Sequence, residues 1–173
     1  MSAPPGHPKQ TSATVLSMGL ARCSQAYVGV GANLGDARAT VVQAMDDLDA
    51  LPDTRTVLRS SLYRSAPVDA KGPDFINAVV ELRTALEPLA LLAQLQRLES
   101  LAGRERTYRN APRTLDLDLL SYANLVLEGP TLSLPHPRMT QRAFVLVPLA
   151  EIAPDRVSEE QLAVVAAQRL EKL

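Results

Sequence analysis

The residues with the clearest potential for chemistry are two aspartates in the segment 112–120, which reads PRTLDLDLL. Asp116 and Asp118 alternate there with leucines, and a period of two is typical of a β-strand with carboxylates on one face and leucines on the other. Cα atoms two residues apart in a strand are roughly 6.5–7 Å apart, so the two carboxylates repel each other and favour a bound cation. Mg²⁺ holding a polyphosphate suits such a pair, because it prefers oxygen ligands.

An arginine-rich segment runs directly into this strand. Four arginines lie within the ten residues 104–113, namely Arg104, Arg106, Arg109 and Arg113. Arginine binds phosphate oxygens in a bidentate manner, so several guanidinium groups aimed at one point can hold a polyphosphate. A solvated basic loop beside a solvent-exposed edge strand is the simpler interpretation of each feature alone. A metal–polyphosphate complex requires both cationic and acidic side chains. Because the arginine-rich segment runs into the strand with the two aspartates, the sequence favours a metal–polyphosphate site.

Other polar or aromatic residues form weaker candidates. Phe75 and Asn77 share the face of a predicted strand that points away from the core, where they could hold a flat, hydrogen-bonding ring, although cross-strand packing would explain Phe75 equally well. Gln96 and Glu99 lie near the end of a predicted helix. His136 lies between two prolines near arginines, which suits a phosphate or nucleotide ligand, although a lone histidine is more often structural.

Composition restricts the class of protein. The 173 residues, 46% hydrophobic and 21% charged, predict one soluble domain, with 1–24 as a disordered extension and 25–173 as the folded part. A net charge of −1 gives no overall signal for nucleic acid or a membrane surface, and no apolar run is long enough to span a bilayer. A single cysteine excludes a disulfide framework and favours a reducing, cytoplasmic location. With only two histidines, a multi-histidine metal site is also excluded.

The pattern of elements predicts an α+β fold. Strands are expected at 26–31, 55–64, 75–82 and 116–120, and helices at 37–50, 88–102 and 159–171. For the second helix the apolar stripe is expected at 89, 92, 95, 98 and 101. This order suits a ferredoxin-like sandwich, a mainly antiparallel sheet with helices on one face and the active site on the other.

Several motifs of this chain together resemble the 6-hydroxymethyl-7,8-dihydropterin pyrophosphokinases of folate biosynthesis. The most specific are PRTLDLDLL at 112–120 and LPHPRM at 134–139, continued by Arg142-Ala143-Phe144. Supporting motifs are VGANLGD at 30–36, SLYRSAP at 61–67 and DFINA at 74–78. The resemblance covers residues 26–155.

The resemblance implies that ATP donates its β,γ-pyrophosphoryl group to the pterin hydroxymethyl oxygen, which gives AMP and the pterin diphosphate. It also implies two Mg²⁺ ions on Asp116 and Asp118, small-molecule substrates only and a monomer. The residues that match catalytic positions are Arg104, Arg113, Asp116 and Asp118. Those that match ATP-binding positions are Gln96, Glu99, Arg106, Arg109, Leu119, His136 and Arg142. Those that match pterin-binding positions are Ser65, Val68, Phe75, Asn77 and Phe144.

Two departures from the family pattern stand out. Phe75 replaces a common tyrosine, which keeps ring stacking and removes a hydroxyl, and Asn110 stands where some members have a tryptophan. Two other functions stay open on the residues alone. A non-catalytic nucleotide or metal sensor would release no AMP, and a metal-dependent phosphohydrolase would release phosphate or pyrophosphate without any pterin.

Overall fold

The computed structural model describes residues 23–67, 72–103 and 114–173. The elements in chain order are β1 Ser24–Ala32, α2 Ala37–Asp49, β2 Thr54–Arg59, β3 Tyr63–Ser65, β4 Phe75–Thr84, α3 Pro88–Leu101, β5 Asp116–Tyr122, the 3₁₀ helix η1 Met139–Gln141, α4 Ala143–Ile152, the 3₁₀ helix η2 Pro154–Arg156, α5 Glu159–Val165 and β6 Leu170–Lys172. Among these described residues, no helix is both long and apolar enough to span a lipid bilayer.

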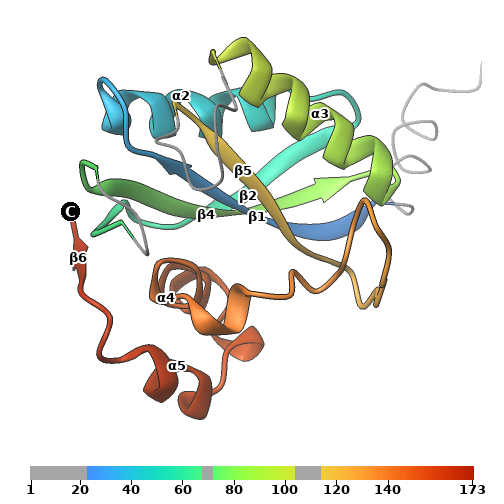
Figure 1. The fold of residues 1–173 in the computed structure, drawn as a ribbon. Coiled ribbons are helices and arrows are strands. Elements are labelled where there is room, and N and C mark those ends of the chain that lie inside the picture. Colours follow the sequence, from blue (N-terminus) through green and yellow to red (C-terminus); the bar gives the residue numbers. More distant parts are fainter. Residues whose placement is uncertain (1–22, 68–71, 104–113) are drawn as a thin grey trace, which may run out of the picture.

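The strands form one antiparallel sheet in the order β5-β1-β4-β3-β6, with β2 also paired to β4. α2 and α3 cover one face of this sheet, and α4 and α5 lie on the other side (Figure 1). The predicted α+β fold is therefore confirmed. The prediction of helices on one face only is corrected, because the buried residues of α4 pack on the second face of the sheet. The face that was predicted to carry the active site therefore also carries a helix.

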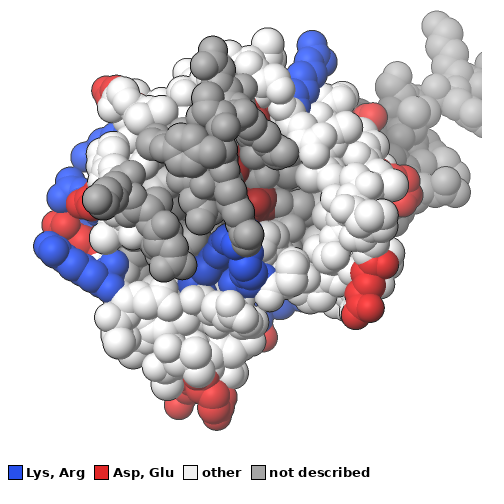
Figure 2. Space-filling model, in the orientation of Figure 1, with Lys and Arg blue, Asp and Glu red and all other residues white. Residues whose placement is uncertain are grey.

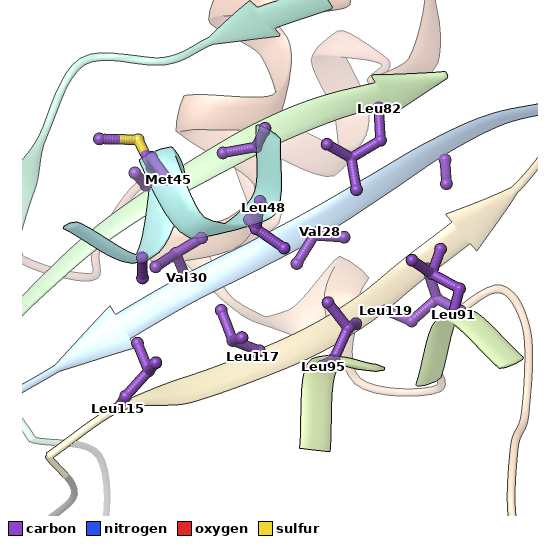
Figure 3. Packing of buried hydrophobic residues seen from close by; sticks show 14 of the residues in the cluster. Val28, Val30, Met45, Leu48, Leu82, Leu91, Leu95, Leu115, Leu117 and Leu119 are labelled. Atoms are coloured by element: carbon purple, nitrogen blue, oxygen red, sulfur yellow. The ribbon is translucent and has the colours of Figure 1, made fainter. Parts of the chain in front are cut away.

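The main core lies between the sheet and the pair α2 and α3. Alternate residues of β1, β4 and β5 point into it, among them Val28, Val30, Leu82, Leu117 and Leu119 (Figure 3), and Val80 of β4 belongs to the same cluster. α2 contributes Val41, Ala44, Met45 and Leu48, which lie at helical spacing on one side of the helix. The helix begins where the Asp36 side chain accepts a hydrogen bond from Ala39 N at 3.0 Å and so caps its first turn.

The apolar stripe of α3 was predicted wrongly. Leu91 and Leu95 are fully buried, whereas Leu89 and Leu101 are 59% and 74% exposed. Three residues advance a helix by about 300°, so a strict spacing of three drifts by about 60° per step and leaves the buried face within two turns. The spacing of four from Leu91 to Leu95 to Glu99 follows the axis and places a carboxylate at the end of the buried stripe.

The strand predicted at 55–64 is interrupted in the structure. β2 ends at Arg59 and β3 begins at Tyr63, although both pair with β4. Ser60 explains the break, because its backbone N–H donates to Val79 O at 2.9 Å while its Oγ accepts from Val79 N, also at 2.9 Å. The side chain thus replaces the carbonyl that a regular ladder would supply.

The last helix is shorter than predicted. α5 begins after its cap Ser158, close to the predicted start, but it ends at Val165, and residues 170–172 form β6 along the edge of β3. The edge strand β3 offers unpaired backbone N–H and C=O groups, and pairing with them stabilises residues 170–172 as a strand although their sequence pattern is helical.

Glu151 of α4 links these chain segments. Its carboxylate accepts hydrogen bonds from Ser61 N, Ser61 Oγ, Tyr63 Oη and Lys172 Nζ at 2.7–3.0 Å. Burial alone would raise the pKa of Glu151, but the bonds from Ser61, Lys172 and Tyr63 outweigh it and lower that pKa to about 2. Burial and the same bond to Glu151 raise the pKa of Tyr63 to about 12.

Candidate active site

β5 presents the two aspartates on the face opposite the main core. Asp116 pairs with Gly31 and Asp118 with Gly29, both on the central strand β1. Their side chains are partly buried, whereas the alternating Leu115, Leu117 and Leu119 are at most 5% exposed and point into the core (Figure 3). The predicted division of this strand into an acidic face and an apolar face is confirmed.

Glu99 fixes the position of β5. Its side chain is 2% exposed, and Oε1 accepts a hydrogen bond of 3.0 Å from the backbone N–H of Leu117, between the two aspartates. β5 pairs with β1 alone among the described strands, so this bond satisfies a donor at the edge of the sheet. α3 therefore positions the acidic strand through a buried carboxylate.

The acidic strand meets a guanidinium group from the start of α4. Arg142 Nη1 lies 3.4 Å from Asp118 Oδ2, and acidic and basic atoms lie side by side near the middle of the space-filling view (Figure 2). The Arg142 guanidinium also lies over the ring of Phe144, 5.4 Å from its centroid. The two contacts give Arg142 a defined place between the acids and an aromatic ring.

His136 is held close to the same group of charges. Its backbone N–H donates to Leu120 O at 2.8 Å, and its Nδ1 accepts a 3.2 Å bond from Arg138 N, so the neutral ring carries its proton on Nε2. Burial lowers the pKa of His136; Asp118 acts in the opposite direction, while Arg142 and Arg138 lower it further. The ring is therefore a neutral donor at physiological pH.

A second cluster lies two strands away on the same face. Asn77 is 4% exposed and pairs with Gly31, and Phe75 pairs with Ser65. Asn77 Nδ2 donates to Ser65 Oγ at 2.9 Å. Phe144 packs against the cluster that contains Val79, the next residue of β4 on this face. The predicted ring-binding residues Ser65, Phe75, Asn77 and Phe144 thus all belong to one side of the sheet.

Some of the remaining predicted site residues lie outside the described part of the chain, and two others, Gln96 and Leu119, lie within it. Arg104, Arg106, Arg109, Arg113 and Val68 lie outside the described residues. Gln96 is exposed on α3. The side chain of Leu119 is buried in the core, which leaves its main chain as the part that a nucleotide could contact.

Sequence reasoning placed Gly29 and Gly31 in the strand expected at 26–31 but gave neither of them a role. In the structure Gly31 pairs with Asp116 and with Asn77 and faces the site, whereas the space above Gly29 is bounded by the side chain of Leu120. Their spacing of two within a strand was the available signal, since alternate glycines leave one face of a strand without side chains.

The donor set fits Mg²⁺ bound together with phosphate. Among the described residues no three histidine, cysteine, aspartate or glutamate side chains gather as a metal-binding group. Asp116 and Asp118 alone would leave most positions of an octahedral ion to water and phosphate oxygens, as is usual for Mg²⁺ with a nucleotide.

Known proteins resemble this chain over most of its length. The family model described as 7,8-dihydro-6-hydroxymethylpterin-pyrophosphokinase (HPPK) matches residues 27–154. A 2-amino-4-hydroxy-6-hydroxymethyldihydropteridine pyrophosphokinase of Pseudomonas aeruginosa is 48% identical over 130 residues, which are 75% of this chain and 80% of that protein. The enzyme of the same name from Haemophilus influenzae is 43% identical over 133 residues, 76% of this chain and 83% of that protein.

The fold is also found among solved structures. A chain described as HPPK-DHPS in complex with substrates superimposes with a TM-score of 0.61 at 14% identity over 80% of this chain, which spans only 41% of that longer chain. At this identity the likeness concerns the fold alone. With the family model covering most of the sequence and relatives at 43–48% identity, the chain belongs to the HPPK family of pyrophosphokinases.

Proposed function

We propose that this chain transfers the β,γ-pyrophosphoryl group of ATP to 6-hydroxymethyl-7,8-dihydropterin in folate biosynthesis, giving AMP and the pterin diphosphate. The observation that carries the proposal is the position of the acidic pair and the ring-binding cluster. Asp116 and Asp118 share one sheet face with Asn77 and Phe75, with glycines of β1 between them. A phosphate-binding region and a ring-binding region are thus adjacent.

In the reaction, the hydroxymethyl oxygen forms a bond to the β-phosphorus, and the bond from that phosphorus to the α,β-bridging oxygen breaks. AMP leaves with the bridging oxygen, and the hydroxyl proton passes to solvent. No protein nucleophile is required, so positioning and charge stabilisation supply the catalysis. The acceptor and the triphosphate must therefore be held in line.

Each group of residues has a role in this scheme. Asp116 and Asp118 would hold two Mg²⁺ ions, which neutralise charge on the transferred group when bound. Arg142 and His136 lie beside Asp118 and provide donors for phosphate oxygens. Phe75 and Phe144 would stack on the pterin, whose edge Asn77 reads.

The resemblance assigns the remaining contacts. Arg104 and Arg113 would stabilise the transferred group, and Arg106 and Arg109 would bind ATP. Gln96, Glu99 and Leu119 would lie at the nucleotide, Glu99 by holding β5 in place. Ser65 and Val68 would meet the pterin. The monomeric state and the cytoplasmic location stay predictions.

The test is AMP release from Mg-ATP with and without the pterin alcohol. AMP that requires both the pterin and Mg²⁺ is the expected result. A nucleotide sensor would give no AMP, and a phosphohydrolase would give phosphate or pyrophosphate without pterin.

Variants test the assignment of the metal residues. Asp116→Ala and Asp118→Ala should each abolish turnover while the melting temperature stays near that of the wild type, because the partly exposed Asp118–Arg142 pair contributes little stability. Asp155→Ala, at an exposed position in η2, is the matched control and should retain activity. Turnover retained in both site variants would reject the assignment.

A further inference from the structure

The central strand lacks a side chain at the point where the two halves of the site meet. Gly31 pairs with Asn77 on one side and with Asp116 on the other, so these three residues form a row across β4, β1 and β5. Neighbouring strands are about 4.8 Å apart, which puts the backbones at Asn77 and Asp116 about 10 Å apart. A side chain at position 31 would rise between the amide and the carboxylate.

The space above Gly31 is limited by Asn77. A Cβ atom at position 31 would lie 3.3 Å from Asn77 Oδ1 and 4.0 Å from Phe75 Cδ1. The first distance is closer than ordinary van der Waals contact, so the amide would have to shift by a few tenths of an ångström. Asn77 is buried and its Nδ2 is bonded to Ser65 Oγ, so this shift would strain an existing hydrogen bond.

The backbone itself does not require glycine here. Gly31 is absent from the positive-φ residues of the described chain, which include Gly35, Gly72 and Gly103. Glycine in a strand interior is usually destabilising, since it loses more conformational freedom than other residues. The reason for Gly31 therefore lies in the space that it leaves.

The amide has one atom available on this side. Asn77 Nδ2 donates to Ser65 Oγ and, at 3.5 Å, to Phe75 O, while no described donor bonds to Asn77 Oδ1. A nearly buried acceptor beside an open strand position is suited to an N–H on the edge of a flat heterocycle.

We propose that Gly31 is a specificity-determining residue for the acceptor, because its missing side chain lets Asn77 Oδ1 accept a hydrogen bond from the pterin ring. This inference rests on the proposed function and deepens it. It predicts that a methyl group at position 31 weakens pterin binding and leaves nucleotide binding unchanged.

Gly29 provides a matched control two residues away on the same face. A Cβ atom there would meet only side-chain carbons of Leu120, at 3.5–3.8 Å, which is ordinary contact. The experiment compares wild type, Gly31→Ala and Gly29→Ala in fluorescence titrations with 6-hydroxymethylpterin, in the presence of Mg²⁺ and a non-hydrolysable ATP analogue. Binding of the analogue and the melting temperature are measured in parallel.

We expect Gly31→Ala to weaken pterin binding about tenfold, the effect of losing one buried hydrogen bond, with analogue binding within about twofold of wild type. Gly29→Ala should stay within about twofold for both ligands. Unchanged pterin binding in Gly31→Ala, or an equal loss in Gly29→Ala, would overturn the inference.

A double-mutant cycle tests the route through Asn77. In an Asn77→Ala background the added methyl has no amide to displace, so Gly31→Ala should cause no further loss. An additional loss of the same size there would show that position 31 acts independently of Asn77, contrary to the inference. If Gly31→Ala alone does not fold, Asn77→Ala can still be compared with the double variant. That comparison shows whether the methyl group at position 31 affects pterin binding when the amide is absent.

The two proposals fail in different ways. If wild-type protein neither binds the pterin nor forms AMP in its presence, the proposed function is wrong. If wild type does both and Gly31→Ala binds the pterin as tightly, only the role of Gly31 is wrong.

Discussion

Replacing Glu151 with glutamine should lower the stability of the fold at neutral pH and remove part of its dependence on pH. The carboxylate accepts four hydrogen bonds from Ser61, Tyr63 and Lys172, which belong to separate segments of the chain. A glutamine keeps one acceptor oxygen, places an N–H₂ group against these donors and loses the charge that Lys172 faces.

The magnitude follows from the pKa of Glu151. Its lowering from 4.5 to about 2 corresponds to a preference for the charged form of about 3 kcal/mol. Because 28% of the side chain is exposed, solvent screening reduces the contribution to stability to about 1–2 kcal/mol.

The direction of the pH effect follows from the same values. A lowered pKa in the folded state means that the unfolded chain binds more protons, so this stability is fully present above about 4.5 and is lost as pH falls towards about 2. The variant lacks the titrating group and should lose less stability over that range.

The measurement is the free energy of unfolding in urea between about pH 7 and pH 3, for wild type, Glu151→Gln and the control Glu128→Gln. Glu128 is exposed between the bridged residues Leu127 and Leu134. We expect a gap of about 1–2 kcal/mol at pH 7 that narrows in acid, and none for the control. A gap that is absent at pH 7, or constant across the range, would refute the reasoning.

Two further predictions concern the core and the acceptor site. Leu95→Ala should lower the free energy of unfolding by about 2–5 kcal/mol and Leu101→Ala by less than about 0.5 kcal/mol, because only Leu95 is buried; equal losses in urea unfolding would contradict the observed stripe. Phe75→Ala should raise the KM for the pterin roughly 5- to 150-fold, since stacking on an aromatic ring contributes roughly 1–3 kcal/mol. Binding of the ATP analogue should not change, and a parallel loss there would indicate general damage.

The parts of the fold that local patterns determine were predictable. Asp36 caps α2 because its side chain reaches a free N–H one turn ahead, and the alternation at 115–119 sorts leucines from aspartates by geometry alone. The face that carries Asp116 followed from the same alternation. These features depend on neighbours in sequence.

The parts that failed depend on contacts between distant segments. Helical spacing over 159–171 gave no sign that Leu170 would join β3, because the edge that attracts it lies more than a hundred residues earlier. Ser60 interrupts a strand only because Val79 lies opposite. The clearance at Gly31 needs the position of Asn77, which β4 supplies.

Strand β5 has one further consequence, which concerns insertions and deletions. Its leucines fill the core and its aspartates lie on the face of the candidate site, so shifting the register by one residue would exchange the two sets. A misaligned chain would bury both carboxylates and expose its apolar residues, and it would aggregate. In a library of single-residue deletions across 115–119, soluble yield and catalytic competence should therefore disappear together.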